Sequence, residues 1–228
     1  MSELHVLSVF GGPGGTGGNL LGVFLDGGAF PTDRRQAVAT ELGYSETVFV
    51  DDAAEGAIAI YTPSRELPFA GHPTVGTAWL LHETGAPATT LRPPAGDVPF
   101  RIDAEGTWVR ARASWIHPIV FEQLANPAAV QSEPRQAMGS PGRYIWAWID
   151  EPAGVLRARY FVPAFGIGED EATGAAAVLI GGLLGRDLDI RQGVASQLLV
   201  HQGPDRTVEV GGRVELVETR ELPGTTRA

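Results

Sequence analysis

The sequence predicts an α+β protein, and three features of the chain lead to this assignment. Segments rich in β-branched and aromatic residues alternate with dense glycine and proline, 30 and 17 of the 228 residues, a pattern typical of about eleven short strands. Only three helices are clearly marked, and the last is apolar on all sides, so other structure must surround it. A unit of strand, proline, loop and helix also recurs about a hundred residues apart, as expected of two similar halves.

The first half is expected to contain short strands and two helices. The predicted strands are Leu4–Phe10, Leu20–Leu25, Thr47–Val50, Ala57–Thr62, Val98–Ile102 and Trp108–Ala113. Thr32 and Asp33 can cap a helix that ends at Gly43. A second helix is predicted from about His72 to Glu83, because Pro73 suits a first turn and Gly85 lies just beyond the end.

The second half is expected to repeat this plan in a shortened form. The predicted strands are Tyr144–Ile149, Leu156–Phe161, Gln197–Val200, Thr207–Val210 and Val214–Val217. The apolar third helix begins near Thr173, after a loop that includes Pro163 and Gly166. With Trp115–Asn126 as the join, we predict two halves, 1–114 and 115–228.

The composition excludes several classes of chemistry. The chain has no lysine, so Schiff-base, pyridoxal-phosphate and P-loop proteins lose the ammonium group that they need. The absence of cysteine excludes disulfides, thiolate zinc sites, cysteine nucleophiles and thiol-based racemases. A net charge of −10 argues against nucleic acid or an anionic membrane as the partner.

The expected location is the cytoplasm. No apolar run approaches the ~20 residues of a membrane span. The first residues also lack the positive start and apolar core of a signal peptide.

The run Gly11–Gly18 follows a predicted strand and contains the spacing G-x-G-x-x-G. A dinucleotide-binding loop must open a helix, whereas here a second strand follows, so this use is disfavoured. The alternatives are a plain glycine hairpin or a lid that closes over an active site. We expect a mobile lid, because glycine leaves the backbone free.

Glu46, His72 and Asp170 are the candidate catalytic residues. Glu46 lies at the mouth of a buried strand, where a raised pKa would suit a general base, although a solvated glutamate is the plainer alternative. His72 starts a helix whose dipole lowers its pKa, and a plain helix-start histidine is again the alternative. Asp170 lies in an acidic run before the third helix, where capping is the commoner role. The histidines show no metal-like spacing, so no metal is predicted.

Two stretches carry a resemblance to a known family. They are Ser45-Glu46-Thr47-Val48-Phe49-Val50 and the long run from Thr62 through Phe69-Ala70-Gly71-His72-Pro73 to Ala78. Together they resemble the PhzF-like isomerases of phenazine biosynthesis. The second half agrees more loosely, at Phe161-Val162-Pro163, Gly168-Glu169-Asp170-Glu171-Ala172-Thr173-Gly174, Gln192-Gly193 and Val210-Gly211-Gly212.

The resemblance implies a diaminopimelate epimerase-like fold, in which each half wraps a curved, mostly antiparallel sheet around a central helix. It also implies a homodimer without a cofactor, whose site lies in the cleft between the halves. Glu46 then matches the family's general acid and base, while His72 and Asp170 hold and polarise a small carboxylate substrate. The residues expected to bind that substrate are Asn19, Gly71, Thr173, Gly174 and Ala175.

Three positions depart from the family's pattern. Leu20 follows Asn19 where the family has proline, Glu171 replaces a proline, and Ala175 replaces a serine. Gly71 and Ala175 stand where the related epimerases carry their two cysteines.

The favoured hypothesis is a cofactor-independent isomerase that moves a proton on a small unsaturated carboxylate. An epimerase or racemase acting at one carbon is one alternative. A degenerate member that binds a metabolite or a partner without turnover is the other.

Overall fold

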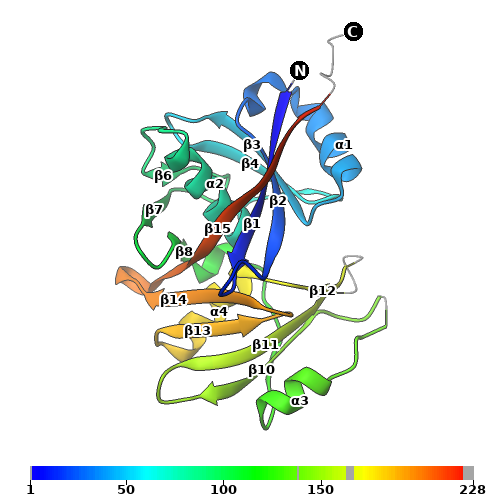
Figure 1. The fold of residues 1–228 in the computed structure, drawn as a ribbon, viewed down its shortest axis with the longest axis vertical. Coiled ribbons are helices and arrows are strands. Elements are labelled where there is room, and N and C mark those ends of the chain that lie inside the picture. Colours follow the sequence, from blue (N-terminus) through cyan, green and yellow to red (C-terminus); the bar gives the residue numbers. More distant parts are fainter. Residues whose placement is uncertain (1, 138, 163–166, 223–228) are drawn as a thin grey trace.

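The computed structural model describes residues 2–137, 139–162 and 167–222. The chain forms two lobes, one above the other in Figure 1, and the long strands β1, β2 and β15 extend from the upper lobe to the lower one. Within the described residues no helix is long and apolar enough to cross a membrane.

The upper lobe wraps strands around the helix α2 (Gly71–Glu83). Its strands are β1 (Ser2–Gly11), β2 (Gly17–Phe24), β3 (Glu46–Asp52), β4 (Ala57–Tyr61), β5 (Glu66–Leu67), β6 (Thr90–Leu91), β7 (Val98–Ile102) and β8 (Thr107–Arg112). All pairs in this lobe are antiparallel except β2 with β3. Helix α1 (Thr32–Leu42) contacts β3 and β4, and short 3-10 turns lie at Gly27–Ala29 and Ala113–Trp115.

The lower lobe repeats this arrangement around α4 (Gly174–Leu184). Its elements are β9 (Phe121–Gln123), α3 (Pro127–Ser132), β10 (Arg143–Asp150), β11 (Val155–Val162), β12 (Ile167–Asp170), β13 (Leu188–Gln192), β14 (Ser196–Gln202), a 3-10 turn (Pro204–Arg206) and β15 (Thr207–Leu222). The strand order across both lobes is β5-β4-β3-β2-β1-β15-β14-β13-β11-β10-β9.

Strand β15 connects the two lobes, and the prediction of two separate strands there was wrong. Its first residues pair with β8 and β14, and its later residues pair with β1. Gly211 and Gly212 suggested a break, but a Cβ at either position would meet the ring of Trp108 or Phe10, at 2.4 Å and 2.9 Å. These glycines therefore admit aromatic rings to a continuous strand. The division at 114 and 115 stays a prediction, with β15 shared by both lobes.

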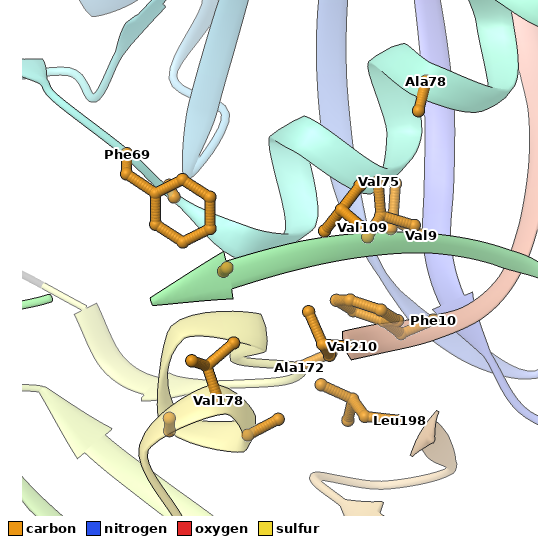
Figure 2. Packing of buried hydrophobic residues seen from close by; sticks show 14 of the residues in the cluster. Val9, Phe10, Phe69, Val75, Ala78, Val109, Ala172, Val178, Leu198 and Val210 are labelled. Atoms are coloured by element: carbon orange, nitrogen blue, oxygen red, sulfur yellow. The ribbon is translucent and has the colours of Figure 1, made fainter. Parts of the chain in front are cut away.

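A continuous apolar core joins the two central helices. Val75 of α2 lies close to Val9 and Val109, and Ala78 of α2 and Val178 of α4 belong to the same cluster (Figure 2). Ten of the residues of α2 are buried, which explains why its sequence shows almost no polar face. The core thus holds the first turns of both helices next to each other at the boundary between the lobes.

The predicted strands and helices are otherwise present, with a few differences. Pro31, rather than Thr32 or Asp33, precedes α1, and no side chain caps that helix. Strand β13 was not predicted, although its residues alternate between buried and partly exposed. Pro163 and Gly166 of the predicted repeat lie outside the described residues.

Candidate active site

The candidate site lies where the first turns of α2 and α4 meet. A Cβ placed on Gly71 would be 2.6 Å from the carbonyl carbon of Gly174, and one placed on Gly174 would be 2.9 Å from the Cα of Gly71. Real side chains do not approach backbone so closely, so both positions require glycine. Because neither glycine has a side chain, the first turns of α2 and α4 can touch, and the neighbouring residues His72 and Thr173 lie close together.

We expect Gly71→Ala to damage both the fold and the site. The added methyl group must push apart two backbones, and overpacking of this kind costs about 1–3 kcal/mol. The matched control is Gly182→Ala in α4, where a Cβ meets only Val208, at an ordinary 3.9 Å. Thermal unfolding should show a lower Tm for Gly71→Ala and an equal or higher Tm for the control. Equal Tm values for wild type and Gly71→Ala would contradict the close contact.

Glu46 and His72 form a buried pair. Glu46 begins β3, His72 is the second residue of α2, and His72 Nδ1 lies 3.2 Å from Glu46 Oε2. The side chains are 16% and 5% exposed, respectively. Glu46 Oε2 makes no hydrogen bond of ordinary geometry within the described residues. A shielded carboxyl oxygen without a regular partner is available to a substrate.

Asp170 is the centre of a hydrogen-bond network. Its Oδ1 accepts from Asn19 Nδ2 at 2.7 Å, and its Oδ2 accepts from Thr173 Oγ1 at 2.5 Å. Gln192 Nε2 donates to Thr173 Oγ1 at 2.8 Å and to the Asp170 carbonyl at 3.0 Å. Behind it, the buried Tyr144 hydroxyl donates to Gln192 Oε1 at 3.3 Å. The carboxylate is therefore held from both sides.

The Asn19 side chain connects Asp170 to Ser45, the residue before Glu46. Its Nδ2 also donates to the Ala172 carbonyl at 3.2 Å, and its Oδ1 accepts from Ser45 Oγ at 3.1 Å. Ser45 directly precedes Glu46, and its hydroxyl opposes the rise in the pKa of the Glu46 carboxyl group. Three of the four hydrogen-bonding positions of the Asn19 amide are therefore occupied by protein groups. Its predicted contact with substrate stays a prediction.

Burial shifts the pKa values of all three candidate catalytic residues. Desolvation, with the nearby charge of Asp170, raises the pKa of Glu46 to about 8. Desolvation raises the pKa of Asp170 to about 6, against the opposing hydrogen bonds from Thr173 and Asn19. Desolvation lowers the pKa of His72 to about 3. Burial therefore favours the protonated forms of Glu46 and Asp170 and the neutral form of His72.

The acidic residues before α4 do not cap that helix, which was the alternative role for Asp170. Thr173 is the N-cap residue and its side chain makes no cap hydrogen bond. Glu169 instead pairs with Arg159 at 2.7 Å, Asp170 belongs to the site, and Glu171 binds the turn before β14.

Ser45, Gln192 and Tyr144 were not proposed as site residues from the sequence. Ser45 and Gln192 lie inside the stretches that carried the family resemblance, which was the available signal. Nothing in the sequence indicates Tyr144, because a tyrosine in a strand is most often a core residue.

The described residues include no candidate metal site, and a cavity among them is separate from the candidate active site. They contain no group of three or more histidine, aspartate or glutamate side chains that could hold a metal ion. A cavity of about 260 Å³ lies beside Gly11, Gln197 and Arg213, and Glu46, His72 and Asp170 do not line it.

With this geometry established, the comparisons with known proteins identify the family. The model of the PhzC-PhzF family, described as phenazine biosynthesis-like protein, matches residues 10–140. The chain belongs to the PhzC-PhzF family. Trans-2,3-dihydro-3-hydroxyanthranilate isomerase of Pseudomonas aeruginosa is 30% identical to it, over 92% of this chain and 83% of the relative. An uncharacterized isomerase of Pasteurella multocida is 27% identical, over 90% and 89% of the two chains.

Solved structures show the same fold. A PhzF family protein of Enterococcus faecalis superposes with a TM-score of 0.79 at 22% identity, covering 96% of this chain and 98% of the other. A probable proline racemase of Agrobacterium radiobacter gives a TM-score of 0.66 at 10% identity, over 98% and 93%. The predicted family, the epimerase-like α+β fold and the assignment as a PhzF-like isomerase are confirmed.

Proposed function

We propose that this PhzC-PhzF member moves a proton between two carbons of a small unsaturated carboxylate, with Glu46 as the group that carries it. The observation that supports this best is the Glu46–His72 pair, because a shielded carboxyl oxygen lies 3.2 Å from a neutral imidazole and has no regular hydrogen bond. A carboxyl group with a pKa of about 8 is a stronger base when ionised than an ordinary glutamate. It also holds a proton long enough to return it.

The reaction needs no change of oxidation state. The ionised Glu46 carboxylate takes a proton from an sp³ carbon of the substrate, and a carboxyl O–H bond forms as the C–H bond breaks. The electron pair left behind shifts along the conjugated system. Glu46 then gives the same proton, or one exchanged with solvent, to another carbon, which restores the carboxylate. General acid–base chemistry accounts for each step, so the proposed reaction has no cofactor.

His72 and the backbone amides at the starts of α2 and α4 are the groups that stabilise the negative charge of the intermediate. Neutral His72 can donate one hydrogen bond, and amides at helix starts favour anions. Such preorganised donors are usually the largest contribution to rate.

Asp170, whose pKa burial raises to about 6, already accepts hydrogen bonds from Asn19 and Thr173 through its two carboxyl oxygens. In the proposed reaction it also accepts a hydrogen bond from a substrate hydroxyl or amino group.

The substrate class follows from the relative of known activity. That relative is named trans-2,3-dihydro-3-hydroxyanthranilate isomerase, so a cyclic dihydro carboxylate is the first candidate substrate. Gly71, Gly174, Thr173 and Ala175 would border this substrate, with Asn19 behind Asp170. A homodimer and a cytoplasmic location stay predictions.

The experiment that tests the proposal is isomerisation in deuterated water. Trans-2,3-dihydro-3-hydroxyanthranilate and related unsaturated carboxylates are incubated with the protein, and mass spectrometry and NMR record isomerisation and deuterium at carbon. We expect isomerised product with deuterium at the carbon that receives the proton. Deuterium at one stereocentre with only its configuration changed would instead identify an epimerase. Binding without exchange would identify a non-catalytic binding protein.

A further inference from the structure

The Glu171 carboxylate orders the turn between β13 and β14. Its Oε1 accepts from the Val194 amide at 2.8 Å, the Ala195 amide at 3.2 Å and the Ser196 hydroxyl at 2.8 Å, and its Oε2 accepts from Val194 at 2.9 Å. Gly193 has φ +60°, and a Cβ there would lie 2.2 Å from Glu171 Oε2. The turn is therefore shaped to receive this carboxylate.

Ser196 passes the connection to the glycine hairpin between β1 and β2. The Gly18 amide donates to Ser196 Oγ at 2.9 Å, while the same hydroxyl donates to Glu171. An ionised carboxylate can only accept, so it orients the Ser196 hydroxyl with its oxygen free to accept from Gly18. The hairpin tip lies against β14 in Figure 1, and Cβ atoms on Gly12 or Gly17 would overlap the Ala195 backbone.

The next residue along the hairpin is Asn19, which donates to Asp170. Asp170 is in turn adjacent to Glu171 in the chain. A closed circuit therefore runs from Asp170 through Asn19, Gly18 and Ser196 to Glu171 and back. It joins strand β2 of the upper lobe to the lower lobe directly beside the candidate site.

We propose that Glu171 and Ser196 form a positioning clamp, which holds the glycine hairpin so that the Asn19 amide is presented to Asp170. Glu171 and Ser196 bond to the turn and to the hairpin rather than to Glu46 or His72. The clamp acts through Asn19, whose hydrogen bond stabilises the ionised form of Asp170, whereas the charge of Glu171 by itself raises the pKa of Asp170. The part of the proposal that concerns rate rests on the proposed function, whereas the part that concerns Asp170 does not.

The clamp also bears on the expected lid. The hairpin ends are held by the Gly18–Ser196 bond and by close backbone contacts at Gly12 and Gly17, whereas Gly14 has open space around it. A closing motion that moves Gly18 must therefore break the Ser196 contact. The mobile lid stays a prediction.

The decisive variant is Ser196→Ala, which removes the link to Gly18 without changing any charge. Carbon-detected NMR titration, with the Asp170 signal assigned by its loss in Asp170→Asn, measures the pKa of Asp170. Asn19→Ala sets the shift expected when the hydrogen bond is absent. We expect both variants to raise the pKa of Asp170, since each weakens stabilisation of the carboxylate. If Ser196 has only a structural role, Ser196→Ala should lower the Tm and leave the pKa of Asp170 unchanged.

Glu171→Gln gives an independent measurement, because its amide nitrogen would face the backbone N–H donors of the turn. Backbone amide exchange of Gly18 should accelerate in this variant and in Ser196→Ala. Where the protein isomerises a substrate, kcat should fall about tenfold in each, and the double variant should fall by less than the product of the two.

Glu209→Gln is the matched control, because this carboxylate also accepts four hydrogen bonds, all from Arg101 and Arg110, away from the clamp. It should leave the Asp170 titration and Gly18 exchange unchanged. An unchanged Asp170 pKa in Ser196→Ala, or unchanged Gly18 exchange in Glu171→Gln, would overturn the clamp. Shifted titration without turnover on any substrate would support the clamp and count against the proposed function.

Discussion

Glu46→Gln is expected to bind the unsaturated carboxylate and to lose proton transfer. The amide keeps the size of the carboxyl group but cannot accept the proton from carbon. General acid–base groups contribute about 10²–10⁴-fold to the rate, so a loss of at least this size is expected. Deuterium incorporation at carbon measures the loss, and calorimetric titration measures the retained binding.

The pH dependence of the wild type supplies a second readout of the same role. Because the pKa of Glu46 is raised to about 8, the ionised base becomes more abundant up to that pH. The value of kcat/KM should therefore rise with pH towards about 8 and then level off. Glu41→Gln, an exposed position on α1, is the control and should show the wild-type profile. Equal exchange by wild type and Glu46→Gln would remove Glu46 from the mechanism.

The same substitution is expected to stabilise the fold, increasingly so at higher pH. Glu46 has a folded-state pKa of about 8 against an ordinary value of 4.5, so the folded state binds its proton more tightly than the unfolded state does. The stability that this proton supplies is complete below pH 4.5 and is lost as pH rises through 8. Relative to a neutral glutamine, the wild type should therefore lose about 3 kcal/mol by pH 7.

Urea unfolding of both proteins between pH 5 and 9 measures this difference. The gap in unfolding free energy should widen up to about pH 8 and then stay constant. At each pH the wild type is compared with Glu46→Gln, because both proteins contain His72. The lowered pKa of His72 makes the fold less stable as pH falls below 6.5, whereas Glu46 makes it less stable as pH rises. The Glu41→Gln control should stay within about 0.5 kcal/mol of wild type at every pH. A gap that does not vary with pH would contradict the raised pKa and with it the proposed base.

Both outcomes together describe a trade-off at one residue. A carboxyl group kept from water is a better base, and the same burial makes its charged form costly for the fold. A variant that gains stability and loses exchange would therefore link the two properties to the same burial.

Most strands and helices, and the Glu46 and His72 part of the site, could be predicted from the sequence. Strand and helix signals depend on residues a few positions apart, so the ends of α2 were read closely from Pro73 and Gly85. The unbroken run around His72 and the stretch around Glu46 carried the family, which the comparisons confirm.

Only the tertiary structure decided how these parts meet. The Asn19–Asp170 bond joins residues 151 positions apart, and the Gly18–Ser196 bond joins residues 178 apart. Such partners are selected by topology, and no local pattern encodes them. The close contact between Gly71 and Gly174 could not be predicted either. A glycine in a sequence does not show whether it forms a turn or makes room for another segment of backbone. The chain thus specified its chemistry locally, whereas long-range packing set the distances and the burial that shift the pKa values of that chemistry.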